Sequence, residues 1–200
     1  MTLAFLLLII VNCKAQTQAI NILDKGNYMY RSEGQYYQDI DFVLNPFEGE
    51  WLYTNGDTTL KIILLKKINH FNSVYHEDVI IGGYEYKVGN NIIISNLAAI
   101  NTDFLNPIEK SIAGNFVINN NGYPPCSDCS VGEKRLNLTF SEFASNIYGD
   151  IIIRKIEVSG QEAIKIIIRG TSGKVHVVGT PLPPADFMVP SGVYTLIKQL

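Results

Sequence analysis

The hydrophobic positions of the chain fall in short runs rather than in helical stripes. From about residue 40 onward, β-branched and aromatic runs are separated by Gly, Asn and Pro, which is typical of many short strands. Apolar residues at helical spacing are almost absent. Only residues 97–106 and 141–146 have patterns that allow a helical turn. The pattern therefore predicts an all-β fold.

Turn residues join several of these runs into hairpins. Asn55-Gly56-Asp57 connects residues 50–54 to 58–66, and Asn-Gly tolerates the positive φ angles of tight hairpin turns. A second turn at 89–91 connects 78–88 to 92–95, with Gly82-Gly83 inside the first strand predicting a bulge or bend.

A third hairpin connects residues 151–158 to 161–169 through Ser159-Gly160. Its charged residues are expected at outward or edge positions, and these are Lys155, Glu157, Lys165 and Arg169. Further strands are expected at 114–118, 134–140, 149–158 and 192–198. Such a series gives about eight to ten strands in meander order. We expect these strands to close into a barrel or to form a β-sandwich, because an open sheet would leave edge strands exposed to aggregation.

Length and composition fit one such domain. The 200 residues, of which 46% are hydrophobic, suffice for one compact core and are too few for two ordinary domains. We assign this domain to residues 41–200. Residues 16–40 are polar and rich in Tyr and Gln, and we expect an irregular tether there. Prolines within 180–186 predict a loop before the final strand.

The first residues have the character of an export signal. Residues 3–11 are all apolar, which is too short for the roughly 18–20 residues of a membrane span but matches the core of a signal peptide. A signal peptide normally has Lys or Arg before this run, and none is present here, so we expect the true start of the chain upstream of Met1. We expect residues 1–15 to be a signal peptide, and the protein to be exported.

Two cleavage reactions compete for the end of this signal. Cleavage after Ala15 would release a soluble protein. Cleavage before Cys13 would make a lipoprotein, because Ile10-Val11-Asn12-Cys13 resembles the bacterial lipoprotein signal. Acylation of Cys13 would anchor the protein to a membrane surface without spanning it. The expected location is the periplasm, or the outer membrane or cell surface through the lipid.

Charge and motif content restrict the functional classes. The formal net charge of −3 and the scattered Lys and Arg residues exclude a nucleic-acid partner. The chain has no G-x-S-x-G elbow, phosphate loop or H-E-x-x-H motif. Glu48 and Glu50 would share one strand face, but acids at the start of a strand are usually solvated. We therefore predict no catalytic residue, no cofactor and no metal ion.

Cys126 and Cys129 form the one thiol pair of the domain. An oxidising compartment favours a disulfide between them. A thioredoxin-like redox site would need the pair at a helix N-terminus, whereas 134–140 is expected to be a strand. A zinc site would need two more ligands, and the distant His70, His76 and His176 form no spaced pair. Both alternatives remain open.

Two resemblances complete the sequence picture. Gly49 and Trp51, in Phe47-Glu48-Gly49-Glu50-Trp51, resemble the G-x-W element of lipocalin-type barrels, in which the Trp plugs one end of the barrel. Ile81-Gly82-Gly83-Tyr84, the Cys13 region and the closing residues 194–199 are similar to an uncharacterised family of exported proteins from flavobacteria and related Bacteroidetes. That resemblance implies envelope localisation and an all-β fold, with no functional residue.

The functional hypothesis is a non-enzymatic binding or interaction module. Its partner would be a small apolar ligand, a glycan or another envelope protein. Abundant tyrosines are able to stack on sugars or line a partner surface, although Tyr is also an ordinary strand residue; they include Tyr28, Tyr30, Tyr36, Tyr37, Tyr84, Tyr86 and Tyr123. The alternative is a hydrolase or redox accessory with a site assembled from scattered strand residues.

Overall fold

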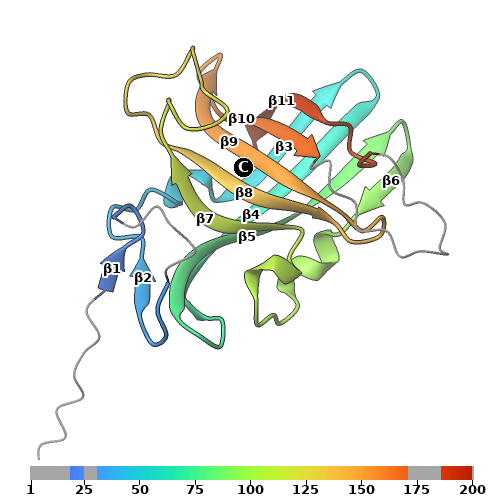
Figure 1. The fold of residues 1–200 in the computed structure, drawn as a ribbon. Helices are drawn as coiled ribbons and strands as arrows, with labels where there is room; N and C mark the ends of the chain where they lie inside the picture. The colour runs from blue at the N-terminus through green and yellow to red at the C-terminus, as the bar shows by residue number, and fades with distance from the viewer. Residues whose placement is uncertain (1–18, 25–30, 171–185, 200) are drawn as a thin grey trace, which may run out of the picture.

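The protein is a closed β-barrel with short additional strands (Figure 1). The computed structural model describes residues 19–24, 31–170 and 186–199, and the proposed signal peptide with Cys13 lies outside these residues. All strands of the described residues belong to one 11-stranded sheet, which contains a closed 8-strand antiparallel barrel. Helical structure in the same residues is limited to short 3-10 turns, without an α-helix. The all-β prediction is confirmed.

The barrel strands follow one another around the wall in chain order. They are β3 (Gly49–Asn55), β4 (Thr58–Phe71), β5 (His76–Val88), β7 (Ile112–Ile118), β8 (Arg135–Glu142), β9 (Ile147–Val158), β10 (Gln161–Gly170) and β11 (Gly192–Lys198). Neighbours along this series pair antiparallel, and β11 returns to β3, where Ile197 lies opposite Leu52. Joining the first and last strands removes the free edges that an open meander would expose.

Three short strands lie outside the barrel wall. They are β1 (Ala19–Asn21), β2 (Tyr36–Gln38) and β6 (Asn91–Ser95). Because β4 pairs with β5 on one side, the other side of β5 is shared: β2 pairs with its start, β7 with residues 80–82 and β6 with residues 85–88. Figure 1 accordingly shows β1 and β2 beside one end of the barrel and β6 beside the other.

The predicted hairpins are confirmed, with one difference at Gly82-Gly83. The pairing of β4 with β5 continues without a shift through both glycines, and its irregularity lies between Lys67 and His70 instead. A Cβ at Gly82 would lie 2.5 Å from the backbone oxygen of Ile63. Gly82 therefore permits a close approach of two strands rather than a bulge.

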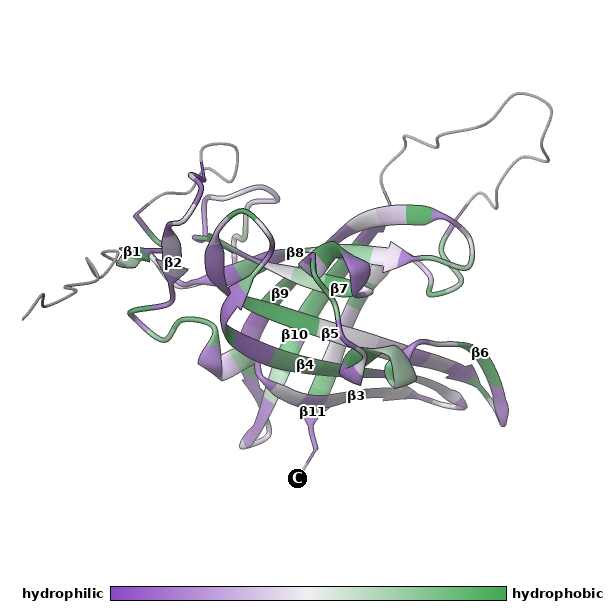
Figure 2. Ribbon diagram, turned by 90° about the horizontal axis from the view of Figure 1, so that it is seen from below, coloured by the Kyte–Doolittle hydropathy of each residue, from purple (hydrophilic) through white to green (hydrophobic). Residues whose placement is uncertain are grey.

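The barrel interior is filled by side chains. One buried cluster contains the inward-facing residues of every barrel strand, including Leu60, Ile62, Leu138, Ile153 and Ile166, each at most 1% exposed. An 8-strand barrel is just wide enough for its side chains to fill it. Figure 2 shows hydrophobic and hydrophilic colour alternating along the barrel strands, as expected where every second side chain points into the interior. This argues against an apolar ligand inside the barrel.

One end of the barrel is closed around Trp51. Its side chain is fully buried, and its Nε1 donates a hydrogen bond of 3.0 Å to the carbonyl oxygen of Phe47 in the 3-10 turn Asn45–Phe47. The ammonium nitrogens of Lys155 and Lys198 lie 4.7 and 5.5 Å from the centre of a Trp51 ring. Trp51 is thus held at this end of the barrel by one hydrogen bond and two cation–π contacts.

Lys155, expected at an outward or edge position, takes an edge position on the inner face of its strand. Lys155 lies opposite Ile164, which faces the buried interior, and directly paired residues of antiparallel strands point to the same face. The charge is accommodated because it lies at the end of the barrel, over the Trp51 ring, where the Lys155 side chain is still 26% exposed. Its Nζ also forms an ion pair with Glu162 at 3.1 Å.

The described part of the 16–40 segment is more ordered than the predicted tether. β2 pairs parallel with β5, and Tyr37 and Asp39 are almost fully buried. The Asp39 carboxylate accepts hydrogen bonds from the backbone nitrogens of Val43 and Leu44 and from the Lys66 ammonium at 2.7 Å. This stretch is therefore packed against the barrel end, and its role as a tether to an anchor stays a prediction.

Candidate functional site

The described residues contain a hollow on the outer wall of the barrel, lined by both polar and apolar residues. It has a volume of about 330 Å³ and lies over β5, β7, β8 and β9, between the loop after β4 and the 3-10 turn Pro107–Glu109. A second, more open hollow of about 700 Å³ extends toward the end of β10. Both are lined by Phe116, Asn137 and Asp150, so together they form one continuous surface. We call it the outer groove.

Strand alternation explains why the floor of the outer groove is polar. On β8, Leu136, Leu138 and Phe140 belong to the buried cluster, so Asn137 and Thr139 point to the opposite face. Thr139 lies opposite Asp150 of β9, which carries this polar face onto the next strand. The same sequence pattern that fills the interior therefore places an amide, a hydroxyl and a carboxylate side by side outside.

Two of these polar groups are available to a ligand. The structure gives no side-chain hydrogen bond to Asn137 or Thr139 within the part of the chain that it describes, and both side chains are partly exposed. An amide offers two donors and an acceptor, and a hydroxyl offers one donor with acceptor capacity. These groups are suited to a ligand that presents several hydroxyls.

One wall of the outer groove is built around an arginine. Arg169 donates to the Asp150 carboxylate at 3.1 Å, and its guanidinium carbon lies 5.0 Å from the centre of the Tyr123 ring. Tyr123 is 76% exposed. Cation–π contact fixes the ring from one side. The result is an aromatic surface held beside an ion pair.

The opposite wall is held by a buried polar network. Glu77 forms an ion pair with Arg31, and both side chains are 5% exposed. The guanidinium carbon of Arg31 lies 5.2 Å from the centre of the Tyr75 ring, which borders the groove. Asn115 donates to Glu77 at 2.9 Å. Since buried charges are stable only when paired, this network rigidly positions Tyr75 and Glu77.

A related carboxylate ties β2 to the same end of the barrel. Asp78 accepts hydrogen bonds from the Tyr36 hydroxyl at 2.6 Å and from the backbone nitrogen of Asn69 at 2.9 Å. Burial, followed by this hydrogen bond to the Asp78 carboxylate, raises the pKa of Tyr36 above its ordinary value. Tyr36 therefore acts as a structural donor rather than as a base.

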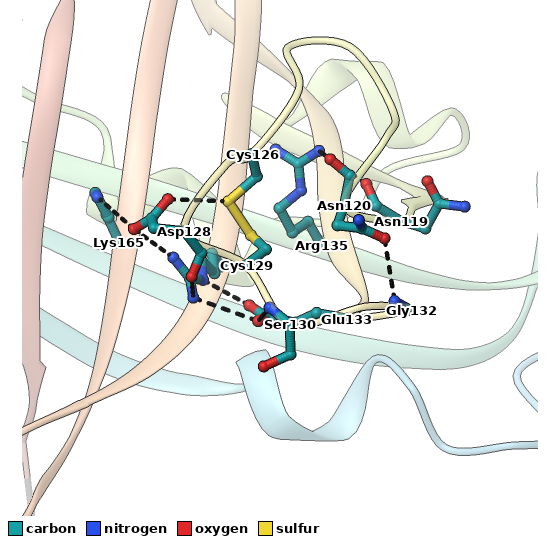
Figure 3. A network of polar contacts seen from close by, with 11 residues as sticks. Asn119, Asn120, Cys126, Asp128, Cys129, Ser130, Gly132, Glu133, Arg135 and Lys165 are labelled. Atoms are coloured by element: carbon teal, nitrogen blue, oxygen red, sulfur yellow. Dashed lines mark hydrogen bonds and ion pairs between the residues drawn. A yellow bond between two sulfur atoms is a disulfide. The ribbon is translucent and has the colours of Figure 1, made fainter.

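The cysteine pair lies in the loop between β7 and β8. The Sγ atoms of Cys126 and Cys129 are at disulfide distance, 2.01 Å, in agreement with the predicted pair. Asp128, between them, accepts from Arg154 at 2.8 Å and from Lys165 at 3.3 Å, and hydrogen bonds from these two cations lower its pKa (Figure 3). The loop is thereby fastened to the outer faces of β9 and β10.

The cysteine turn also contains the one group of potential metal ligands found in the described residues. The ligand atoms of Cys126, Asp128 and Cys129 lie within 4.8 Å of one another. Two sulfurs bonded to each other offer no thiolate, however, and thiolates are what zinc binds. As a disulfide, the turn cannot hold zinc.

The other predicted positions lie away from the outer groove. Gly49 and Trp51 lie at the closed end of the barrel, and a Cβ at Gly49, whose φ is +139°, would approach Lys198 Cε to 3.2 Å. Glu50 forms an ion pair with Lys61 at 2.6 Å, and Glu48 accepts from the backbone nitrogen of Lys66. The pair of acids is thus engaged in local contacts.

Most of the tyrosines named above belong to other parts of the molecule. Tyr84 and Tyr86 are buried in the core, Tyr36 and Tyr37 belong to β2, and Tyr123 alone of the set lines the groove. Tyr28, Tyr30 and His176 lie outside the described residues. Asn137, Thr139 and Asp150 were missed, because alternation shows which side chains point outward but not where the wall is hollowed.

The fold and the groove define a filled up-and-down β-barrel with a concavity of mixed polar and apolar lining on its outer wall. The chain belongs to a family of unknown function, DUF6705, which matches residues 1–199. No curated protein and no solved structure matches it. In the described residues, no helix has the length and apolar character needed to cross a membrane.

Proposed function

We propose that this protein is a non-enzymatic, exported binding module that holds a glycan in the outer groove. The observation that carries the proposal is the combination of an exposed aromatic ring, Tyr123, with the unengaged Asn137 and Thr139 side chains on one concave surface. The C–H face of a sugar ring stacks on an aromatic ring, while its hydroxyls require directional donors and acceptors.

The filled barrel supports a site outside it. An apolar ligand would need a cavity lined by hydrophobic side chains, whereas the inward positions of the barrel are occupied by their own side chains. The outer groove offers amides, carboxylates and a hydroxyl beside apolar residues such as Ile108 and Phe116. A sugar, which has both hydroxyls and an apolar C–H face, fits this mixed lining better than a hydrocarbon does.

A redox role has less support. The Cys126–Cys129 turn is followed by the strand β8, and no helix N-terminus in the described residues faces it to lower a thiol pKa. The carboxylates of the groove, Asp150 and Glu77, are each engaged by an arginine. These contacts favour holding a ligand over hydrolysing it.

Calorimetric titration with neutral trisaccharides tests the proposal. We expect the purified protein to bind at least one of chitotriose, cellotriose, maltotriose and mannotriose. Tyr123→Ala and Asn137→Ala should each weaken that binding by about tenfold, the equivalent of about 1.4 kcal/mol. Phe42→Ala is the matched control, since Phe42 is an exposed aromatic residue outside the groove, 65% exposed.

Two results would overturn the proposal. One is that none of the four sugars binds. The other is that a sugar binds with equal affinity to the wild type and to both groove variants, which would mean that the binding site lies outside the outer groove. Circular dichroism on each variant ensures that lost binding does not reflect lost folding.

A further inference from the structure

A second, smaller pocket lies beneath the cysteine loop and shares no lining residue with the outer groove. Its volume is about 110 Å³, and its walls are formed by Pro125, Cys126, Ile152 and Ile167 together with charged residues. The charged residues are Arg135 on β8, Arg154 on β9, Lys165 on β10 and Asp128 of the loop. Three adjacent strands therefore each direct one cation to the same place.

Arg135 is the unusual member of this group because it is buried without a carboxylate partner. The residue is 2% exposed, and its hydrogen bonds within the described chain come from Nη2 alone, to the carbonyl oxygens of Asn119 and Gly122 at 2.8 Å and of Asn120 at 3.5 Å. Its Nε is buried and has no partner. Figure 3 shows Arg135 next to Cys126 and the Asn119–Asn120 turn, with Asp128 directed away toward Lys165.

A buried guanidinium that lacks a carboxylate partner is expected to bind an anion. A buried charge is costly unless it is paired and hydrogen-bonded, and carbonyl oxygens supply only partial negative charge. Burial lowers the pKa of Arg135, and the neighbouring Arg154 acts in the same direction. An anion in the pocket would pair the guanidinium charge and accept a hydrogen bond from Nη1, for which the described chain gives no partner.

The surrounding charges leave room for one anion. Asp128 pairs with Arg154 at 2.8 Å and with Lys165 at 3.3 Å, while Glu133 pairs with Arg154 at 2.5 Å. Three cations, Arg135, Arg154 and Lys165, therefore face two carboxylates, which leaves one positive charge. That excess charge is located on the buried Arg135.

We propose that this pocket, the Arg135 pocket, binds the phosphate or sulfate group of a ligand. A tetrahedral oxyanion presents oxygens in several directions at once, which suits cations that converge from three strands, whereas a planar carboxylate presents two oxygens in one plane. Pro125 and the Cys126–Cys129 turn form one wall of the pocket. The loop thus completes the site, and this inference is independent of glycan binding in the outer groove.

Nitrogen-15 NMR on the full protein provides the test, because the Arg135 Nε–H group gives its own resonance. Inorganic phosphate, and separately inorganic sulfate, is titrated at constant pH and constant ionic strength. We expect the Arg135 Nε–H resonance to shift and to saturate with phosphate or sulfate. A shift that grows linearly and equals the shift caused by chloride would overturn the proposal.

Variants separate this pocket from general surface charge. Arg135→Lys keeps the charge but loses the unused Nε–H and Nη1 donors, so we expect at least about tenfold weaker binding. Lys165→Met, at a partly exposed position, should weaken binding severalfold. Lys61→Met removes a cation from another part of the wall, where it pairs with Glu50, and should leave binding unchanged. Unchanged affinity in both Arg135→Lys and Lys165→Met contradicts the proposal.

The remaining arms address the loop and the source of the anion. Replacing Cys126 and Cys129 together by Ser should weaken phosphate binding severalfold, because the loop wall is no longer held. If Arg135→Lys does not fold, the wild-type titration and the Lys165→Met variant still test the proposal.

Sedimentation with phosphatidylglycerol vesicles, compared with phosphatidylcholine vesicles, distinguishes a lipid headgroup from a soluble ligand. If the protein binds none of phosphate, sulfate and the vesicles, the proposal is overturned.

Discussion

The inner and outer faces of the same strands perform different tasks. On β8, Leu136, Leu138 and Phe140 are at most 1% exposed and pack in the interior, whereas Asn137 and Thr139 between them form the floor of the outer groove. The inner face is a packed core in which each side chain is constrained by its neighbours. The outer face of β8 keeps two polar side chains, Asn137 and Thr139, without a hydrogen-bond partner among the described residues. Stability and binding should therefore respond to different residues that are adjacent in sequence.

The largest expected effect comes from the inner face at the closed end. Trp51→Ala removes a fully buried ring and should lower the free energy of unfolding by about 3–5 kcal/mol. Asn137→Ala on the outer face should change it by less than about 0.5 kcal/mol. Urea denaturation of both variants measures the difference. Equal losses in the two variants would show that the two faces are not separated in this way.

A smaller loss is expected where two strands approach closely. Gly82→Ala would place a methyl group 2.5 Å from the Ile63 backbone oxygen, so we expect a loss of about 1–3 kcal/mol. Gly170→Ala is the control, because the nearest atom to its Cβ would be 3.7 Å away. If urea denaturation shows the two variants equally stable, the close approach at Gly82 is not as tight as described.

The cysteine turn should contribute less to stability than the interior does. A disulfide that closes a loop with a sequence separation of 3 restricts few unfolded conformations, so replacing both cysteines by Ser should cost about 2 kcal/mol or less. Intact mass measured before and after reduction first confirms that the bond is present. A loss as large as that of Trp51→Ala would mean that the loop is part of the core.

The effect that is smallest at neutral pH is a dependence of stability on alkaline pH. Burial raises the pKa of Tyr194 to about 12, and its hydroxyl donates to the Pro190 carbonyl oxygen at 2.5 Å. The unfolded chain releases this proton near pH 10, before the folded protein does. Tyr194 therefore contributes a stability that is complete below pH 10 and is lost between pH 10 and about 12. Tyr194→Phe should reduce the fall in stability over this range, as measured by urea denaturation at several pH values.

The inner face could be predicted from sequence far better than the outer one. β-branched runs and Asn-Gly or Ser-Gly turns located the hairpins β3–β4 and β9–β10, because these signals are local. β1 and β2 were missed since strands of 3 residues show no period and pair in parallel with distant partners. The edge position of Lys155 was predicted, whereas its place on the inner face was not, because a charge at the rim of a barrel is able to lie over an aromatic ring.

The candidate sites depend on contacts that no local pattern reveals. Asn137 and Asp150 become neighbours of Tyr123 only when β8, β9 and the loop before β8 come together. Likewise, Arg135 resembles any other strand arginine until the cysteine loop covers it. The Cys126–Cys129 pair was predictable because its spacing is local, whereas the pocket beside it required the tertiary structure.

Chemical-shift mapping with the best-binding trisaccharide tests the central claim most directly. If the outer wall is the binding face, the side-chain amide of Asn137 and the backbone amides of Thr139 and Asp150 should shift, while the methyl groups of Leu60, Ile153 and Ile166 should keep their positions. Large, saturating shifts of those interior methyl groups, with an unchanged Asn137 amide, would contradict the account.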